Sequence, residues 1–253
     1  MIKQSEIKTI SRQNGVPIST IERDYTQNWL LKYLPEMAFK GGTCLRKIYF
    51  KDYRFSDDLD FTLLEEISFA DLEEKISNAI QHAKTESNIE FMNEINSKKV
   101  TNGYSFDIFF RITRATGSPI KIKLDITKNK NEQIIDKLTQ KVIKHPYSDK
   151  LNKKVLPYSL DEIFAEKTRS LFERTRPRDL YDVWYLKDIL DLDKALFSKK
   201  CEFKKITPRK DKLQMRKKDF INSWENSLKH QLRKIPNAEK TFEDVINYLE
   251  NWT

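Results

Sequence analysis

The 253-residue sequence is poor in the residues that build disulfide and zinc frameworks. It has two cysteines, Cys44 and Cys201, which are too few to cross-link a small secreted domain. Its three histidines are scattered along the chain and show no zinc-ligand spacing. Cys44 lies on an apolar helical stripe, so a reducing cytoplasm is the simplest setting for the protein.

Long apolar segments are also missing. No stretch approaches the roughly 20 apolar residues that a membrane-spanning helix needs, and the N-terminus has no apolar signal-peptide core. We therefore expect a soluble cytoplasmic protein with no membrane partner. The hydrophobic content of 38%, with 11% aromatic residues, is sufficient for one large core or two smaller ones.

Acidic residues are outnumbered by basic ones, 38 to 47, which gives a net charge of +9 and favours a polyanionic partner. The excess is densest from Lys199 to Lys218, where ten basic residues accompany Glu202 and Asp211. Such a run is suited to contacts with the phosphates of a nucleic acid. The alternative is a set of solvated helix faces and loops in a sequence that is rich in lysine throughout.

The periodicity of apolar residues separates a sheet region from a helical region. Two strands with strict alternation are predicted to join in a hairpin around residues 115–118. Their buried positions are predicted to be Tyr104, Phe106, Ile108, Phe110 and Ile112 in the first strand, and Ile120, Ile122, Leu124 and Ile126 in the second. A helix is predicted over about residues 69–86, and capping boxes predict two more helix starts, at Ser19 and Ser159.

Helical periodicity continues from Ser159 to the end of the chain, with Phe220, Trp224, Leu228 and Leu232 at four-residue spacing. The order of elements predicts an α+β fold of two lobes. We assign residues 1–150 to a mixed-sheet lobe with flanking helices, and residues 151–253 to a helical lobe.

The most informative passage runs from Arg54 to Phe61 and contains an Asp-x-Asp pair. In a strand, Asp58 and Asp60 project to one face, while Leu59 projects to the other. Two neighbouring carboxylates repel each other unless a cation lies between them, and hard oxygen ligands suit Mg²⁺ or Mn²⁺. The pattern predicts a metal site, and the alternative is a pair of solvated carboxylates on an edge strand.

A glycine turn, Lys40-Gly41-Gly42-Thr43, lies upstream of this pair and follows an apolar strand. A short helix is predicted from Thr43 to about Phe50, with a buried stripe of Cys44, Leu45, Ile48 and Tyr49. Glycine lets the backbone approach a phosphate closely, and the start of a helix attracts anions. The order of strand, glycine turn, helix and acidic strand therefore predicts a phosphate-binding turn beside a metal site.

A later strand supplies a third carboxylate. If the even-numbered residues of 118–127 are buried, Asp125 lies on the polar face, where it approaches Asp58 and Asp60. Two-metal phosphoryl transfer commonly uses three such groups, one of which helps to activate the attacking hydroxyl. The alternative is a surface aspartate paired with Lys121 or Lys123.

Lys167 falls on an apolar stripe of the helix that Ser159 opens, and a lysine that points inward needs an anion. One candidate anion is the triphosphate of a bound nucleotide. The other is Asp179 or Asp182, which share one face of the following helix, and the two alternatives are compatible. Arg178, at the start of that helix, is either an ion-pair partner or an active-site cation.

These ordered motifs resemble the nucleotidyltransferase superfamily related to polymerase beta. More narrowly, they resemble the AbiEii/AbiGii-type toxin nucleotidyltransferases of bacterial abortive-infection and toxin-antitoxin systems. The resemblance covers roughly residues 17–190, and it rests on the glycine turn, the Asp-x-Asp passage, Ile21–Tyr25, Glu166-Lys167 and Arg176–Asp182. The interval between Gly42 and Asp58 is somewhat longer than in the broader superfamily. The phosphate contacts are therefore either Gly42 and Thr43 or their neighbours.

The resemblance implies a metal-dependent nucleotidyltransferase that moves a nucleoside monophosphate from an NTP onto an acceptor hydroxyl. Asp58, Asp60 and Asp125 are predicted to be catalytic and to bind Mg²⁺ or Mn²⁺. The predicted nucleotide-binding residues are Gly41, Gly42, Thr43, Ser56, Lys167, Arg178 and Asp179.

Basic charge and the resemblance together favour RNA, above all the 3′ end of tRNA, as the acceptor. The resemblance also implies a toxin with a cognate antitoxin as a partner. One alternative is transfer to a small molecule such as an aminoglycoside, or to a protein side chain. The other is a noncatalytic nucleic-acid-binding protein that retains the fold, against which the intact Asp-x-Asp pair argues.

Overall fold

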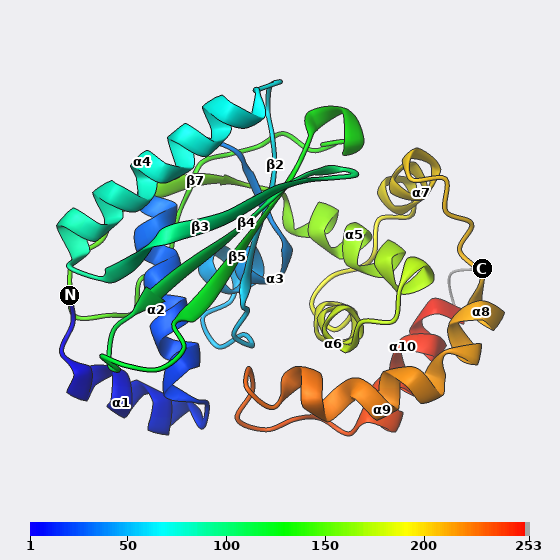
Figure 1. Ribbon diagram of the computed structural model, residues 1–253. Coiled ribbons are helices and arrows are strands. Elements are labelled where there is room, and N and C mark those ends of the chain that lie inside the picture. Colours follow the sequence, from blue (N-terminus) through cyan, green and yellow to red (C-terminus); the bar gives the residue numbers. More distant parts are fainter. Residues whose placement is uncertain (251–253) are drawn as a thin grey trace. The chain divides into compact units, whose positions relative to one another are not determined.

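The structure, a computed structural model, describes residues 1–250 of the chain. Contacts divide the chain into two compact units, which are described separately (Figure 1). The sheet unit comprises Met1–Glu132 and Leu138–Tyr158, and the helical unit comprises Gln133–Lys137 and the chain from Ser159 onward. The α+β class expected from the sequence is confirmed.

The sheet unit is built on a seven-stranded mixed sheet with the strand order β3-β4-β5-β2-β1-β7-β6. The strands are β1 (Ala38–Lys40), β2 (Asp58–Thr62), β3 (Glu90–Val100), β4 (Gly103–Arg111), β5 (Ile120–Thr127), β6 (Lys141–Val142) and β7 (Lys154–Pro157). β2 runs parallel to β5 and β1 runs parallel to β7, while the other neighbours are antiparallel. The predicted hairpin is confirmed as β4 and β5, although Ile112 and Ile120 are half-buried.

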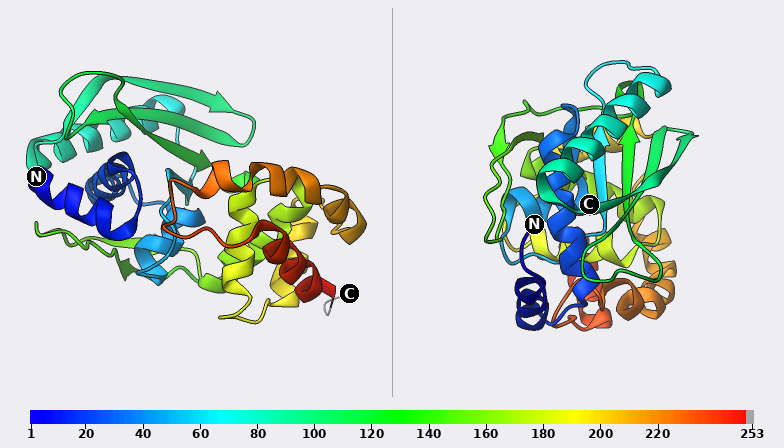
Figure 2. Two further views of the ribbon diagram at one scale, coloured as in Figure 1. Left: turned by 90° about the horizontal axis from the view of Figure 1, so that it is seen from below. Right: turned by 60° about the vertical axis from the view of Figure 1, so that its left-hand side comes forward.

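Two long helices cover one face of this sheet. α2 (Ile18–Tyr33) packs against β5 and against α4 (Phe69–Ser87), which in turn packs against β3 (Figure 2). The apolar side of the strands supplies the buried core, which includes Leu59, Phe106 and Leu124. The opposite side of the sheet is therefore left for polar residues. The unit also contains α1 (Gln4–Asn14) and the 3₁₀ turn η2 (Asn129–Asn131).

The glycine turn after β1 opens a short helix. α3 (Gly41–Cys44) continues into a π-helical segment, η1 (Leu45–Tyr49), so the helix begins two residues earlier than expected. Cys44, Leu45 and Ile48 are buried, which confirms most of the apolar stripe that the sequence predicts.

The two capping boxes have different outcomes. Ser159 accepts a hydrogen bond from the backbone N–H of Glu162 and caps the following helix, as predicted. The helix start predicted at Ser19 is wrong, because α2 begins at Ile18 and Pro17 occupies the cap position. Proline has a backbone angle already suited to helix entry and gives up no needed N–H, so it fixes the start before the serine is reached.

The helical unit contains α5 (Leu160–Glu173), α6 (Pro177–Leu186), α7 (Lys194–Phe203), α8 (Lys210–Met215), α9 (Lys217–Leu228) and α10 (Ala238–Glu250). α5 packs against α6 and α7, and α6 packs against α9 and α10. Phe220, Trp224 and Leu228 form a buried row on α9, as expected, whereas Leu232 lies beyond the end of this helix and is half-buried. Within the described residues, no helix combines the length and apolar character that crossing a membrane requires. Cys44 and Cys201 are both buried free thiols.

Candidate active site

Strand β2 presents two carboxylates on one face. Asp58 and Asp60 alternate along it with Leu59 and Phe61, which are buried in the core. Both aspartates are half-buried, so solvent reaches the face on which they lie. The predicted placement of the Asp-x-Asp pair on the polar side of a strand is confirmed.

Asp125 lies on the same face. The parallel pairing of β2 with β5 sets Asp60 beside Asp125, and Asp58 beside Lys123. The predicted placement of a third carboxylate next to the pair is therefore confirmed. The alternative of an ion pair is also present, because Lys123 Nζ lies 2.6 Å from Asp125 Oδ2.

The charges on this face attract a cation. Partial burial lowers the pKa of Lys123, but its hydrogen bond with Asp125 raises that pKa. The charges of Asp125, Asp58 and Asp60 raise it further, so the pKa of Lys123 lies above its ordinary value. An ammonium group is thus held in the field of three carboxylates.

The donor set on this face suits a divalent metal ion. Oxygen ligands from carboxylates match the preference of Mg²⁺ and Mn²⁺, and the ammonium group of Lys123 marks the place as attractive to positive charge. Across residues 1–250, no three His, Cys, Asp or Glu side chains are already arranged to ligate one metal ion. Asp58, Asp60 and Asp125 are the residues that would turn toward a common ion.

The glycine turn touches this carboxylate face directly. Gly41 has a φ of +79°, and a Cβ atom placed on it would lie 2.3 Å from Asp60 Oδ2. Any side chain here would be strained in its backbone and would displace the carboxylate. The predicted proximity of the glycine turn and the Asp-x-Asp pair is confirmed, and it depends on glycine at this position.

A buried arginine lies over the second glycine. A Cβ atom on Gly42 would come 2.6 Å from Arg54 Nη2 and 3.1 Å from Ser56 Oγ. Arg54 is 2% exposed and donates a hydrogen bond to the carbonyl of Phe55 at 3.1 Å. Arg54 belongs to the Asp-x-Asp passage, but the sequence predicted no role for it. A basic residue between a glycine turn and an acidic strand is the signal that points to this position.

Thr43 has a structural partner. Its hydroxyl is buried and donates a hydrogen bond to the backbone carbonyl of Asp58. This bond fixes α3 to the first residue of β2. The threonine side chain therefore positions the acidic strand against the glycine turn.

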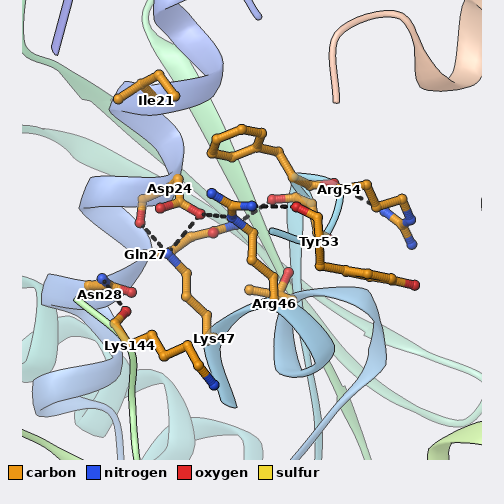
Figure 3. Close-up of polar contacts among 12 residues, drawn as sticks. Ile21, Asp24, Gln27, Asn28, Arg46, Lys47, Tyr53, Arg54 and Lys144 are labelled. Carbon is orange, nitrogen blue, oxygen red and sulfur yellow. Dashed lines mark hydrogen bonds and ion pairs between the residues drawn. The ribbon is translucent and has the colours of Figure 1, made fainter. Parts of the chain in front are cut away.

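An ion cluster behind the turn holds α2 to the segment that follows α3 (Figure 3). Asp24 Oδ1 lies 2.9 Å from both Arg46 Nε and Lys47 Nζ, and Asp24 Oδ2 accepts a hydrogen bond of 2.6 Å from Tyr147. Burial raises the pKa of Asp24, but the charges of Lys47 and Arg46 outweigh that effect and hold the pKa well below its usual range. The carboxylate is therefore ionised and fully paired.

The same helix holds the start of β2. Arg23 Nη1 lies 2.7 Å from Asp57 Oδ1, and Arg23 Nε donates to the carbonyl of Lys121 at 2.9 Å. Gln27 Nε2 donates to the carbonyls of Ser56 and Asp57 at 3.0 and 3.1 Å. The Ile21–Tyr25 motif thus serves to fix the two strands that carry the carboxylates.

In the helical unit, Lys167 forms the ion pairs that the sequence offered as one alternative. Its Nζ lies 2.8 Å from Asp179 Oδ1 and 2.8 Å from Asp182 Oδ2. Asp179 Oδ2 also accepts a hydrogen bond of 2.8 Å from Arg174. Burial raises the pKa of Asp179, but the two cations lower it far below its usual range. Arg178 lies in the first turn of α6. Contacts of these residues with a nucleotide stay predictions.

The basic run between residues 199 and 218 is less uniform than its sequence. Lys200 is fully buried, with its Nζ 2.6 Å from Glu162 and 3.1 Å from Glu166. Arg216 donates to the carbonyl of Leu171 at the end of α5. Two more of the ten basic residues form surface ion pairs, Arg209 with Asp211 and Lys217 with Glu243.

The architecture is that of the nucleotidyltransferase toxins. It superposes on MenT4, a nucleotidyltransferase toxin from Mycobacterium tuberculosis, with a TM-score of 0.66 and 15% identity over 98% of this chain and 88% of that one. JHP933 from Helicobacter pylori gives a TM-score of 0.56 and 19% identity over 93% of this chain and 92% of that one.

The chain belongs to the AbiEii family, because the family model described as nucleotidyl transferase AbiEii toxin of a type IV toxin-antitoxin system matches residues 25–248. The protein is therefore a nucleotidyltransferase, and the resemblance stated from its motifs is confirmed. A comparison with curated proteins finds no match to the sequence.

Proposed function

We propose that this toxin transfers a nucleoside monophosphate from an NTP to the 3′ end of an RNA, with tRNA as the preferred acceptor, and releases pyrophosphate. The observation that carries the proposal is the open carboxylate face beside the glycine turn. There the parallel register brings Asp60 next to Asp125. Gly41 has no side chain, so the carboxylate of Asp60 fits against the turn. Phosphoryl transfer requires this combination of anionic ligands and closely approaching backbone.

The three carboxylates have distinct proposed roles. Asp58 and Asp60 hold Mg²⁺ or Mn²⁺, and Asp125 completes the ligand set and accepts the proton of the attacking hydroxyl. When bound, the metal supplies positive charge to the phosphate oxygens as the bond to pyrophosphate breaks. Ser105 Oγ donates to Asp125 Oδ1 at 2.8 Å and so orients this carboxylate.

The phosphates of the nucleotide have a proposed binding site at the glycine turn. Gly41 and Gly42 let the backbone approach, and Ser56 offers a hydroxyl beside them. Arg54 contributes a buried guanidinium group, which suits a phosphate by charge and by geometry. Thr43 supports the turn from behind through its bond to β2.

Lys167 and Arg178 are the proposed phosphate-binding cations of the helical unit. Asp179 and Asp182 hold the ammonium group of Lys167 in one orientation from two sides, so it is pre-organised for an anionic ligand. Under this proposal, Asp179 acts on the nucleotide through Lys167. The reaction takes place in the cytoplasm, and a cognate antitoxin controls it.

One experiment separates the candidate acceptors. The protein is incubated with each labelled NTP, Mg²⁺ and total RNA, and in parallel with an aminoglycoside and with a protein extract. Label on RNA of tRNA size, absent from a parallel reaction of the Asp60→Ala protein, supports the proposal. If the label appears on the aminoglycoside or on protein, that molecule and not RNA is the acceptor. If no reaction yields a labelled product, the catalytic assignment is contradicted.

Basic charge supports RNA as the acceptor, and it can be tested by a matched pair of variants. One replaces four exposed lysines of the run with glutamine: Lys199, Lys205, Lys212 and Lys218. The control replaces four exposed lysines of the sheet unit: Lys3, Lys8, Lys75 and Lys150. If the run binds RNA, the first variant alone loses affinity for tRNA and shows a shallower salt dependence. Equal losses in both variants would assign the effect to net charge.

A further inference from the structure

Both oxygens of Asp125 are engaged within the chain. Oδ1 accepts a hydrogen bond of 2.8 Å from Ser105 on β4, and Oδ2 lies 2.6 Å from Lys123 Nζ, two residues away on the same strand. The serine is neutral and buried, whereas the lysine carries a full charge. The lysine contact is therefore the one that competes with any other cation for Asp125.

Lys121 gives a direct comparison, because it lies on the same strand and the same face. Its Nζ lies 3.2 Å from Asp107 Oδ2 on β4. Lys123, in contrast, stands beside Asp58 in the register of β5 and β2. Two lysines of similar exposure, 48% and 38% for their side chains, thus serve different carboxylates.

We propose that Lys123 is the internal counter-ion of Asp125 and sets the affinity of the carboxylate face for divalent metal, because metal binding must take Asp125 Oδ2 from Lys123. Lys123 is a positioning residue in this role: it holds Asp125 until a stronger cation replaces it. The inference rests on the proposed function, which places the metal among Asp58, Asp60 and Asp125.

Electrostatics and mobility both support the exchange. A divalent ion carries twice the charge of the ammonium group of Lys123, so it is attracted more strongly to Asp125 Oδ2 than the lysine is. The lysine side chain is flexible and partly exposed, so it can move into solvent without leaving a buried charge unpaired. Ser105 keeps its bond to Oδ1 throughout.

The exchange has a consequence for loading. A face that carries its own cation binds a free metal ion weakly, whereas a nucleotide brings its metal and its negative charge together. Lys123, once released from Asp125, then has a phosphate as its new partner. The lysine therefore favours loading of metal with the nucleotide over loading of metal alone.

The test is a titration of Mn²⁺ into the full-length protein without nucleotide, with free Mn²⁺ measured by electron paramagnetic resonance. Lys123→Met is expected to lower the Kd for Mn²⁺ about tenfold, the size of one charge-assisted hydrogen bond. Lys123→Arg keeps the charge and is expected to keep the Kd. Lys121→Met is the matched control and is expected to change the Kd by less than about twofold.

Thermal unfolding provides a second measurement that does not depend on activity. In the absence of metal, Lys123→Met leaves Asp125 without its ion-pair partner, so its Tm is expected to fall below that of the wild type. Added Mn²⁺ is expected to raise the Tm of Lys123→Met by more than it raises that of the wild type or of Lys121→Met.

An unchanged or higher Kd in Lys123→Met overturns the inference, and so does an equal gain in Lys121→Met, which would be a general effect of charge. If Lys123→Met matches the wild type while Asp60→Ala abolishes Mn²⁺ binding, the inference fails and the proposed metal site stands. If the wild type and Lys123→Met bind no Mn²⁺, both the inference and the metal part of the proposed function fail.

Discussion

Two charge clusters in the sheet unit have opposite compositions. In the first, the single carboxylate of Asp24 meets two cations, Arg46 and Lys47, and the Lys47 side chain is 2% exposed. In the second, Asp125 lies beside Asp60 and pairs with Lys123, whose side chain is 38% exposed. A buried cluster with its carboxylate fully paired holds elements together, whereas a half-exposed ion pair can exchange its cation for another.

The two clusters also differ in what a substitution leaves behind. Removing Asp24 leaves Arg46 and Lys47 without their common carboxylate, and Lys47 lies in the protein interior. The cost therefore falls on folding. Asp60 lies on a face that solvent reaches, so under the proposed function the cost of removing it falls on catalysis. The comparison therefore predicts that stability and activity can be lost separately, from positions in the same unit.

The largest effect is expected from Asp60→Ala. Loss of a metal ligand should reduce nucleotide transfer by at least about 1,000-fold, while the free energy of unfolding should change by no more than about 1 kcal/mol. Transfer is measured with labelled NTP and unfolding with urea. Asp107→Ala, on the same sheet face, is the control and should keep its activity. Full transfer by a stable Asp60→Ala protein would remove the catalytic assignment.

Asp24→Asn should have the next largest effect, which is a loss of stability and not of transfer. The amide keeps the size of the side chain but leaves Lys47 buried without its counter-charge, which should lower the free energy of unfolding by about 3–5 kcal/mol. Urea unfolding measures the loss. At a temperature where the variant is folded, transfer should remain within about threefold of the wild type, since Asp24 does not touch the carboxylate face. A variant as stable as the wild type would contradict the structural role of this cluster.

Gly41→Ala should affect both properties to a smaller degree. Its positive φ strains any side chain, at a cost of about 1–2 kcal/mol, and its Cβ would push Asp60 aside and reduce transfer about 100-fold. Gly117→Ala separates the two effects, because Gly117 has a φ of +89° but no heavy atom within 4 Å of its Cβ position. The control should lose stability alone. Equal transfer by both variants would show that Asp60 tolerates a Cβ atom at position 41.

The smallest effect is a difference in acid stability. Because the pKa of Asp24 lies below its unfolded value near 3.8, the unfolded state takes up more protons in acid. The stability that this carboxylate contributes is present above about pH 4 and is lost as the pH falls further. Thermal unfolding from pH 6 to pH 3 should therefore show a steeper fall in Tm for the wild type than for Asp24→Asn. Parallel curves would mean that Asp24 keeps an ordinary pKa in the fold.

The carboxylate face could be predicted from the sequence because it depends on local rules. Alternation along a strand assigns each side chain to a face, and this placed Asp58, Asp60 and Asp125 correctly on the polar side. The glycine turn was recognisable because Gly41 needs a backbone conformation that other residues resist. The family resemblance then joined segments that no periodicity relates.

Other features depend on contacts between distant segments, and local patterns do not encode them. The sequence does not predict strand β3, because it is an edge strand whose residues are largely exposed and alternate poorly. The pairing of Asp24 with Arg46 and Lys47 requires α2 to lie against η1, which only the tertiary structure determines. The position of Arg54 over Gly42 was missed for the same reason.

The loop Gln133–Lys137 belongs to the helical unit, although strands of the sheet unit precede and follow it in the chain. Glu162 accepts hydrogen bonds from the backbone N–H groups of Ile135 and Asp136, and Lys200 donates to the carbonyl of Gln133. On the ribosome, this loop is made before both of its anchors, and at about 5–20 residues per second the delay amounts to several seconds. The strands on either side of the loop are thus synthesised before Glu162 and Lys200, which form the hydrogen bonds of the loop, have been made. A polypeptide released early, after Tyr158, would carry the loop and never receive the residues that secure it.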